Sequence, residues 1–276
     1  MKIGKLRFTA GFTVLWIIIL LLAVTTATYA WFTFTPYTKV TPMAGSVSKG
    51  DGNLLIANAY NGPYDVTCAL TPESTAEVLW PVSTADLENF YVAAAQNDAG
   101  ISYRFAGAND RVNTMVVYGR VYLQSAEAGH DVYFDPDVLG FGNDNQALAA
   151  MRLGLRITSA NGVATHIFAL DDMGSTGGAE ARRTVAESNT VVGSVGSGGQ
   201  ATLVRDPAES LSSYFARGND TSIVPGQARL TALRADEIAT VEYWLYLEGC
   251  DENCINTVQS RDVALQLAFA GIQNDL

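Results

Sequence analysis

The stretch Val241-Glu242-Tyr243-Trp244-Leu245-Tyr246-Leu247-Glu248 decides the fold class of this chain. Every second residue is apolar and falls on one face of an extended chain, which is typical of a β-strand. A second stretch, Asp262 to Phe269, alternates in the same way after the turn at 249–254. Two amphipathic stretches about twenty residues apart predict a pair of strands that closes the domain.

Working outward from this pair, the sequence holds several shorter stretches that also predict strands: 54–57, 64–70, 112–123, 131–134, 151–157 and 165–170. In the stretch 151–157, Arg152 and Arg156 alternate with apolar residues, so we expect both to face outward. The turn residues Asn161-Gly162 predict a hairpin between this strand and the next.

Helix signals are few and short. Ser83 and Asp86 have capping-box spacing and predict one helical turn, and Asp206 is the expected N-cap of a helix over 207–216. Many short strands with few helices predict an all-β fold, an antiparallel β-sandwich of jelly-roll type with a few short helices.

An uncharged apolar segment near the start of the chain predicts export. Lys2, Lys5 and Arg7 precede it, and no charged residue occurs from Phe8 to Thr38. This pattern predicts an N-terminal apolar helix with its basic end in the cytoplasm and an extracytoplasmic remainder. Two readings stay open: a signal peptide cleaved between Ala30 and Trp31, or a retained membrane anchor.

We divide the chain into three parts. Residues 1–30 are the signal peptide or anchor, residues 31–52 an extended N-terminal segment with a connector from Gly45, and residues 53–276 the β-sandwich domain. Within that domain, the Gly- and Ser-rich residues 171–200 predict a flexible loop. Aromatic and β-branched residues fill 31–40, so this part predicts a free strand once it is released.

Charge and cysteine content limit the partners. Removal of residues 1–30, which carry three basic and no acidic residues, changes the net charge from −11 to −14. Such an acidic ectodomain repels phosphate backbones, so we expect no nucleic-acid partner. Cys250 and Cys254 are close enough in sequence to form a disulfide outside the membrane, and Cys68 is the alternative partner for either.

No catalytic motif is evident. A zinc protease needs two histidines one helical turn apart with a glutamate between them, whereas His130 and His166 are distant in sequence. The loop 135–145 carries Asp135, Asp137 and Asp144 as candidate calcium ligands, but the spacing is not that of a helical calcium loop, and a polar turn is the alternative. We therefore predict no enzyme and no cofactor other than this candidate calcium.

Several motifs together resemble the TasA/camelysin-like family of Gram-positive bacteria, whose members are exported proteins processed by a SipW-type signal peptidase. The motifs are the leader end 27–33, the segment Trp80-Pro81-Val82-Ser83-Thr84, the strand 151–157 and the closing segment 244–254. The resemblance implies a jelly-roll sandwich and assembly into biofilm fibres, in which the freed N-terminal strand of one subunit completes the sheet of the next. The donor strand would then include Trp31, Phe32, Phe34 and Tyr37.

Three functions follow as hypotheses. The first is an extracellular structural subunit of the cell surface or biofilm matrix, with itself or other surface proteins as partners and donor-strand addition as the contact. The second is a membrane-anchored jelly-roll module that binds glycans or a protein partner through Trp244 and Tyr246. The third, a camelysin-like metalloprotease, lacks the zinc-binding motif described above.

Overall fold

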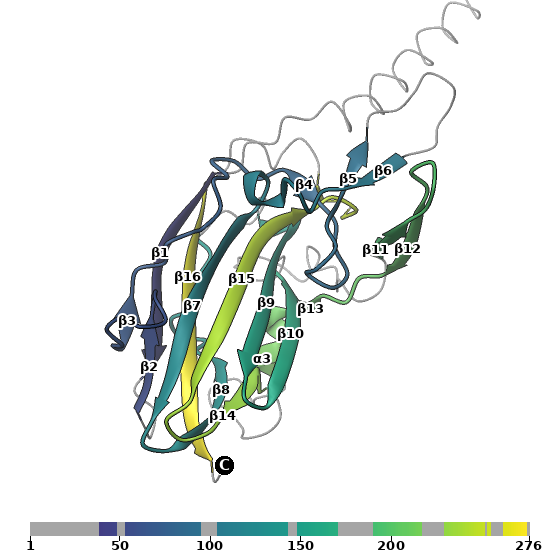
Figure 1. Ribbon diagram of the computed structural model, residues 1–276. Coiled ribbons are helices and arrows are strands. Elements are labelled where there is room, and N and C mark those ends of the chain that lie inside the picture. The colour runs from purple at the N-terminus through teal and green to yellow at the C-terminus, as the bar shows by residue number, and fades with distance from the viewer. Residues whose placement is uncertain are drawn as a thin grey trace, which may run out of the picture. The chain divides into compact units, whose positions relative to one another are not determined.

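The computed structural model describes residues 39–48, 53–94, 104–142, 148–170, 190–216, 229–251, 253–254 and 262–274 (Figure 1). These residues form an all-β protein, as the sequence predicted. The predicted apolar helix, the cleavage site at Ala30 and Trp31, and the donor residues Trp31, Phe32, Phe34 and Tyr37 lie outside the described residues. In the described part of the chain, no helix is long and apolar enough to cross a membrane.

Two large sheets organise the structure. The first has five strands in the order β14 (Thr231–Leu233), β8 (Gly129–Phe134), β16 (Asp262–Asn274), β1 (Lys39–Ser48) and β3 (Thr67–Cys68). The second has the order β13 (Glu209–Ser210), β10 (Gly162–Ala169), β9 (Met151–Ser159), β15 (Ile238–Glu248), β7 (Val117–Ala126) and β2 (Asn53–Ala57). Its seventh strand, β4 (Pro81–Val82), pairs with β15.

Smaller elements complete the described structure. Two ribbons of two strands each are present: β5 (Tyr91–Ala94) with β6 (Arg104–Gly107), and β11 (Thr190–Val195) with β12 (Ala201–Arg205). The helical elements are η1 (Val112–Thr114) and α3 (Leu211–Ala216). The predicted helix over 207–216 is therefore confirmed only for its second half.

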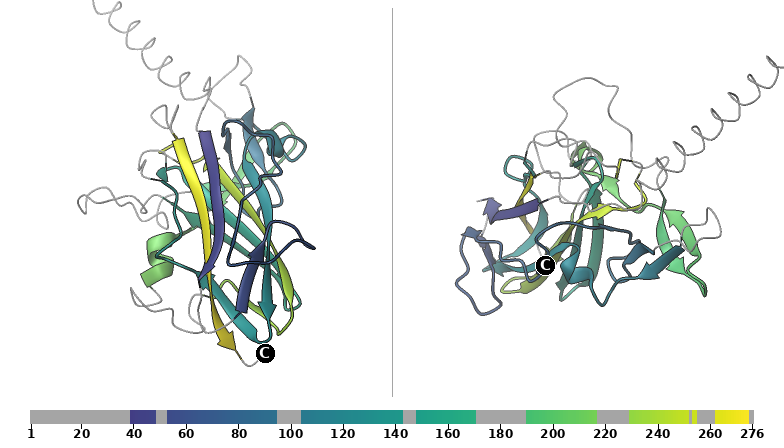
Figure 2. Two further views of the ribbon diagram at one scale, coloured as in Figure 1. Left: turned by 90° about the vertical axis from the view of Figure 1, so that its left-hand side faces the viewer. Right: turned by 90° about the horizontal axis from the view of Figure 1, so that it is seen from above.

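The two large sheets pack face to face as layers of a sandwich (Figure 2). Phe134 of β8 contacts Phe168 of β10 across the interface, with ring centroids 5.1 Å apart, and Tyr214 of α3 closes the same aromatic group 5.5 Å from Phe134. Strand β7 alternates between buried and partly exposed residues along its whole length, which confirms the periodicity predicted for 112–123 from Val117 onward. Strands β8 and β16 also confirm their predictions.

The outer face of the seven-stranded sheet carries a second core. Trp244 and Tyr246 of β15 are buried there, 6% and 0% exposed. They belong to a cluster made with the chain around β4 and β5: Val82, Leu87, Phe90 and Val92. The prediction that Trp244 and Tyr246 face a ligand is therefore wrong, because β15 lies inside its sheet and this segment covers its outer face.

Three further predictions need correction. Ser83 and Asp86 do not start a helical turn: Thr84 Oγ1 accepts from the Leu87 amide at 3.0 Å, and Leu87 has a positive φ of 58° that ends any helical path. The connector expected from Gly45 is strand β1 as far as Ser48. The last part of the loop expected over 171–200 contains strand β11, whose partner β12 begins only at Ala201, and residues 171–189 lie outside the described residues. In both places a glycine occupies a narrow strand position: an added Cβ atom would lie 2.9 Å from Ile56 Cδ1 at Gly45 and 2.7 Å from Val204 Cγ1 at Gly193.

The sandwich is not purely antiparallel. Strand β1 pairs in parallel with β16, β13 with β10, and β4 with β15. The chain crosses from one large sheet to the other between β1 and β2, between β7 and β8, and between β15 and β16. The first described strand thus lies beside the last one, and the whole domain lies between them in sequence.

Candidate functional site

The first candidate site is the position of strand β1 between β16 and β3 in the five-stranded sheet. Nine residue pairs join β1 to β16, from Lys39↔Asp262 to Ser48↔Ala270, with a register shift between Pro42 and Ala44. On its other side, β1 pairs with β3 at only two positions, Gly45↔Cys68 and Ser46↔Thr67. The strand is therefore held mainly by backbone contacts to β16.

Gly45 explains why β1 fits closely at its centre. A Cβ atom at this position would lie 2.9 Å from Ile56 Cδ1 and 3.1 Å from Cys68 Sγ, both too short for an ordinary contact. The neighbouring Val47 is buried, at 5% exposure. The small residue lets β1 approach β2 and β3 closely, and Val47 fills the core beside it.

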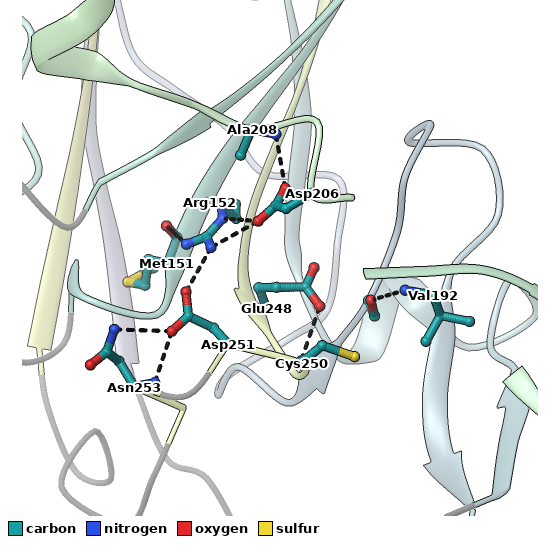
Figure 3. A network of polar contacts seen from close by, with 10 residues as sticks. Met151, Arg152, Val192, Asp206, Ala208, Glu248, Cys250, Asp251 and Asn253 are labelled. Carbon is teal, nitrogen blue, oxygen red and sulfur yellow. Dashed lines mark hydrogen bonds and ion pairs between the residues drawn. The ribbon is translucent and has the colours of Figure 1, made fainter. Parts of the chain in front are cut away.

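The second candidate site is an ionic cluster centred on Arg152, whose side chain is 0% exposed (Figure 3). Its guanidinium donates from Nη2 to Asp206 Oδ2 at 3.0 Å and to Asp251 Oδ2 at 2.6 Å. Nε donates to the same Asp206 oxygen at 3.3 Å, and Nη1 donates to the Met151 carbonyl at 3.1 Å. The prediction that Arg152 faces outward is therefore wrong.

Arg152 is buried because other segments of the chain cover the sheet at the start of β9. Arg152 stands near the start of this inner strand, where the chain after β12 and the turn after β15 cover the sheet and bring the two aspartates. Burial by itself lowers the pKa of the guanidinium, but the negative charges of Asp206 and Asp251 outweigh it and raise the pKa above its usual value. Arg156, four residues on, is half-buried and lies 3.5 Å from Glu88.

Glu248 lies beside this cluster and is 1% exposed. Burial raises the pKa of its carboxyl to about 8, although the Ser83 hydroxyl and the charge of Arg152 oppose the rise. The carboxyl therefore holds its proton at neutral pH. Its Oε1 accepts from the Cys250 amide at 3.1 Å, which fixes the turn that follows β15.

Cys250 and Cys254, predicted as a disulfide, are free thiols in this structure, and so is Cys68. Burial raises the pKa of the Cys250 and Cys254 thiols to about 12 in both cases, so they stay protonated. Asp251 lies between them, and its Oδ1 accepts from the Asn253 amide at 2.8 Å. The turn between the two cysteines thus positions one of the carboxylates that hold Arg152.

The remaining candidate residues are not brought together. His130 lies in β8 and His166 in β10, in different sheets. His130 is fully buried with Nδ1 2.6 Å from Ser125 Oγ, and His166 Nε2 is 2.9 Å from the Leu230 carbonyl. Asp135 Oδ1 accepts from the Asp137 amide at 3.0 Å, as in a plain polar turn, while Asp144 lies outside the described residues.

No cluster of three or more histidine, cysteine or acidic residues with the geometry of a metal site occurs in the part of the chain that the structure describes. The comparisons add no relative: no family model matches this chain, and neither a curated protein nor a solved structure is significantly similar to it. The fold class thus rests on the strands alone, and any function rests on the geometry of the two sites.

Sequence reasoning missed both sites. One signal was present for the ionic cluster: an arginine inside the apolar stretch 151–157 requires a buried anion if its strand is covered on both faces. Asp206 was interpreted only as a helix cap, which is wrong because α3 begins at Leu211; its Oδ1 instead accepts from the Ala208 amide at 2.8 Å in a turn. The pairing of β1 with β16 had no local signal, because it joins residues at the two ends of the chain.

Proposed function

We propose that this protein is an extracellular structural subunit, of the cell surface or of a biofilm matrix, which assembles when β1 of one copy enters the sheet of the next. The observation that supports the proposal is the seating of β1, the first described strand, in parallel beside the last. Because every other element lies between these strands in sequence, β1 can leave the sheet without unthreading any of them.

Strand exchange costs little contact energy here. A strand supplied by another copy would make the same backbone pairs with β16 and the same contact of Gly45 with Ile56, so little contact energy separates the open chain from the closed one. Protein concentration then decides between them. A contact from the N-terminal part of one copy to the sheet of the next is head-to-tail and produces an open filament.

The exported chain would supply the mobile strand. In this proposal, cleavage between Ala30 and Trp31 frees a donor that begins with Trp31, Phe32, Phe34 and Tyr37 and continues into β1. The sandwich behind it is of jelly-roll type, and the repeated crossing of the chain between the two sheets supports this type. The burial of Trp244 and Tyr246 removes the residues on which the glycan-binding alternative depended.

A disulfide between β1 and β16 tests the proposal on the exported protein. Ala44 and Gln266 are register partners and both are half-buried. Neighbouring strands lie about 4.8 Å apart, within the Cα separation that a disulfide spans. We expect the oxidised double variant Ala44→Cys/Gln266→Cys, made with Cys68→Ala, to form no filaments in electron micrographs and no species of filament size in sedimentation, and to form filaments after reduction.

The controls are the two single cysteine variants in the same Cys68→Ala background, which should assemble whether oxidised or reduced. A locked double variant that still assembles at the unmodified rate would refute exchange of β1. An assembled double variant oxidised afterwards should show disulfides between copies, seen as a ladder on a non-reducing gel. Mass spectrometry of the exported N-terminus separately tests cleavage after Ala30.

A further inference from the structure

The ribbon of β11 and β12 presents an open sheet edge. Strand β12 pairs only with β11 among the described strands, and its residues Thr202 to Arg205 are all exposed. Among the strand residues whose exposure the structure describes, no other strand has four consecutive exposed ones. Leu203 and Val204 are 52% and 38% exposed and point to opposite faces of the ribbon, so both faces carry an apolar side chain beside the open edge.

The ribbon is anchored to the rest of the protein at its turn, where the Phe105 amide donates to the Gly199 carbonyl at 2.8 Å, and at two further points. The Val192 amide donates to Ser83 Oγ at 2.9 Å, and Val191 and Val192 are fully buried. Directly after β12, Asp206 is held by the buried guanidinium of Arg152. The open edge therefore has a fixed position, which lowers the entropic cost of adding a strand to it.

The hydrogen bond from the Val192 amide to Ser83 also shows in which direction the backbone N–H and C=O groups of β12 point. Because the Val192 amide points to Ser83, it points away from β12, so Val192 and its partner Leu203 form a pair without mutual hydrogen bonds. In such a pair both residues direct their N–H and C=O groups outward. Leu203 thus offers one donor and one acceptor at the centre of the open edge.

We propose that β12 pairs antiparallel with β12 of a second copy of this chain, about a two-fold axis at Leu203. Each Leu203 then exchanges two hydrogen bonds with the other, and Thr202 lies opposite Val204 of the second copy on both sides of the axis. The contact is isologous and closes on itself, unlike the head-to-tail contact proposed for β1. It does not depend on exchange of β1.

The sequence of β12 lacks the features that normally prevent an edge strand from pairing with a second copy of itself. Natural edge strands are protected by charges or proline, but Ala201 to Val204 contain neither, and the first charge is Arg205. In the proposed register, Arg205 lies opposite Ala201, so the two arginines are about 14 Å apart along the strand, beyond the Debye length of about 8 Å in physiological salt. Pro207 and the turn glycines, Gly198 and Gly199, limit the ladder to this strand.

A short ladder predicts a weak contact, which becomes important when many copies are held together. If the exported protein forms filaments through β1, pairs of β12 would join neighbouring filaments sideways, and many such contacts would act together. In a protein locked by the disulfide between β1 and β16, the same contact would remain as a dimer. The two proposals can therefore fail separately.

Cysteine cross-linking of the exported protein tests the register. Paired residues in a hydrogen-bonded position have Cα atoms about 5.5 Å apart, which a disulfide spans, whereas diagonal residues are about 7–8 Å apart. We expect Leu203→Cys to form a disulfide between two copies at least tenfold faster than Thr202→Cys. Tyr60→Cys, at an equally exposed site of 54%, measures random collisions.

A charge variant tests the affinity in solution. Leu203→Lys places two positive charges opposite each other on the axis, so we expect the dimer dissociation constant in sedimentation to rise by about tenfold, the equivalent of one or two hydrogen bonds. Val163→Lys makes the same change at an exposed residue of β10 and should leave the constant unchanged. The proposal would be overturned if Leu203→Cys formed the disulfide no faster than Thr202→Cys or Tyr60→Cys. It would also be overturned if the protein locked by the disulfide between β1 and β16 were strictly monomeric.

Discussion

Replacement of Arg152 by methionine should destabilise the protein more than any surface change. The substitution removes four hydrogen bonds, three of them to carboxylates, and leaves Asp206 and Asp251 buried at 5% and 1% exposure without their cation. Loss of one partner from a buried ion pair costs about 3–5 kcal/mol, most of it from the uncompensated charge that remains. In a domain of this size, the melting temperature should fall by about 6–20 °C.

Circular dichroism during heating and urea titration of the exported protein measure this loss. Arg120→Met is the matched control, because Arg120 forms an ion pair with Glu73 at 2.6 Å with both side chains about 40% exposed. An exposed pair is worth less than about 1 kcal/mol, so the control should be nearly silent. The triple variant Arg152→Met/Asp206→Asn/Asp251→Asn should recover much of the stability, since no buried charge remains. If Arg152→Met and Arg120→Met lose equal stability, the assignment of a buried charge cluster is wrong.

Three further outcomes follow from buried groups. Burial raises the pKa of Glu248 from 4.5 to about 8, so the folded chain keeps a proton that the unfolded chain releases, and the melting temperature should fall from about pH 4.5 to 8 more steeply than that of Glu248→Gln. Burial lowers the pKa of His130 below 6.5, so the unfolded chain gains a proton first as pH falls, and stability should drop below about pH 6.5 in the native protein but less in His130→Asn. Gly154→Ala should cost about 1–3 kcal/mol in urea titration, because its Cβ would lie 2.5 Å from Leu87 Cδ2, whereas Gly107→Ala meets no atom within 4 Å and should cost little.

The sequence predicted those strands whose two faces have different surroundings. Strand β7 shows its alternation because one face is buried and the other is partly exposed. Strand β15 alternates in sequence, yet its last residues are buried on both faces, so Trp244, Tyr246 and Glu248 gave no sign of what covers them. Trp244 and Tyr246 are covered in part by the chain around β4 and β5, more than a hundred residues earlier, which no local pattern encodes.

The two candidate sites were unpredictable for the same reason. Arg152 meets carboxylates that are 54 and 99 residues further along the chain, and in its own stretch it has the spacing of an outward residue. Strand β1 has a partner at the far end of the sequence. The glycines and serines near both β1 and β11 favour a loop by composition, but a close approach such as that of Gly45 to Ile56 requires a residue without a side chain.

Strand β1 can be exchanged between copies, whereas the ionic cluster around Arg152 holds the end of the ribbon β11–β12 in place. Strand β1 is joined to the sheet by backbone pairs that a second copy can supply equally well, so it can be exchanged at little cost. The ribbon β11–β12 ends on Asp206, whose carboxylate is tied to the fully buried guanidinium of Arg152. Loss of Arg152 should therefore release the end of β12 and slow the cross-linking of Leu203→Cys, while the disulfide between positions 44 and 266 should still form. A variant in which both cross-links slow equally would indicate general unfolding and would refute a specific coupling between Arg152 and the ribbon.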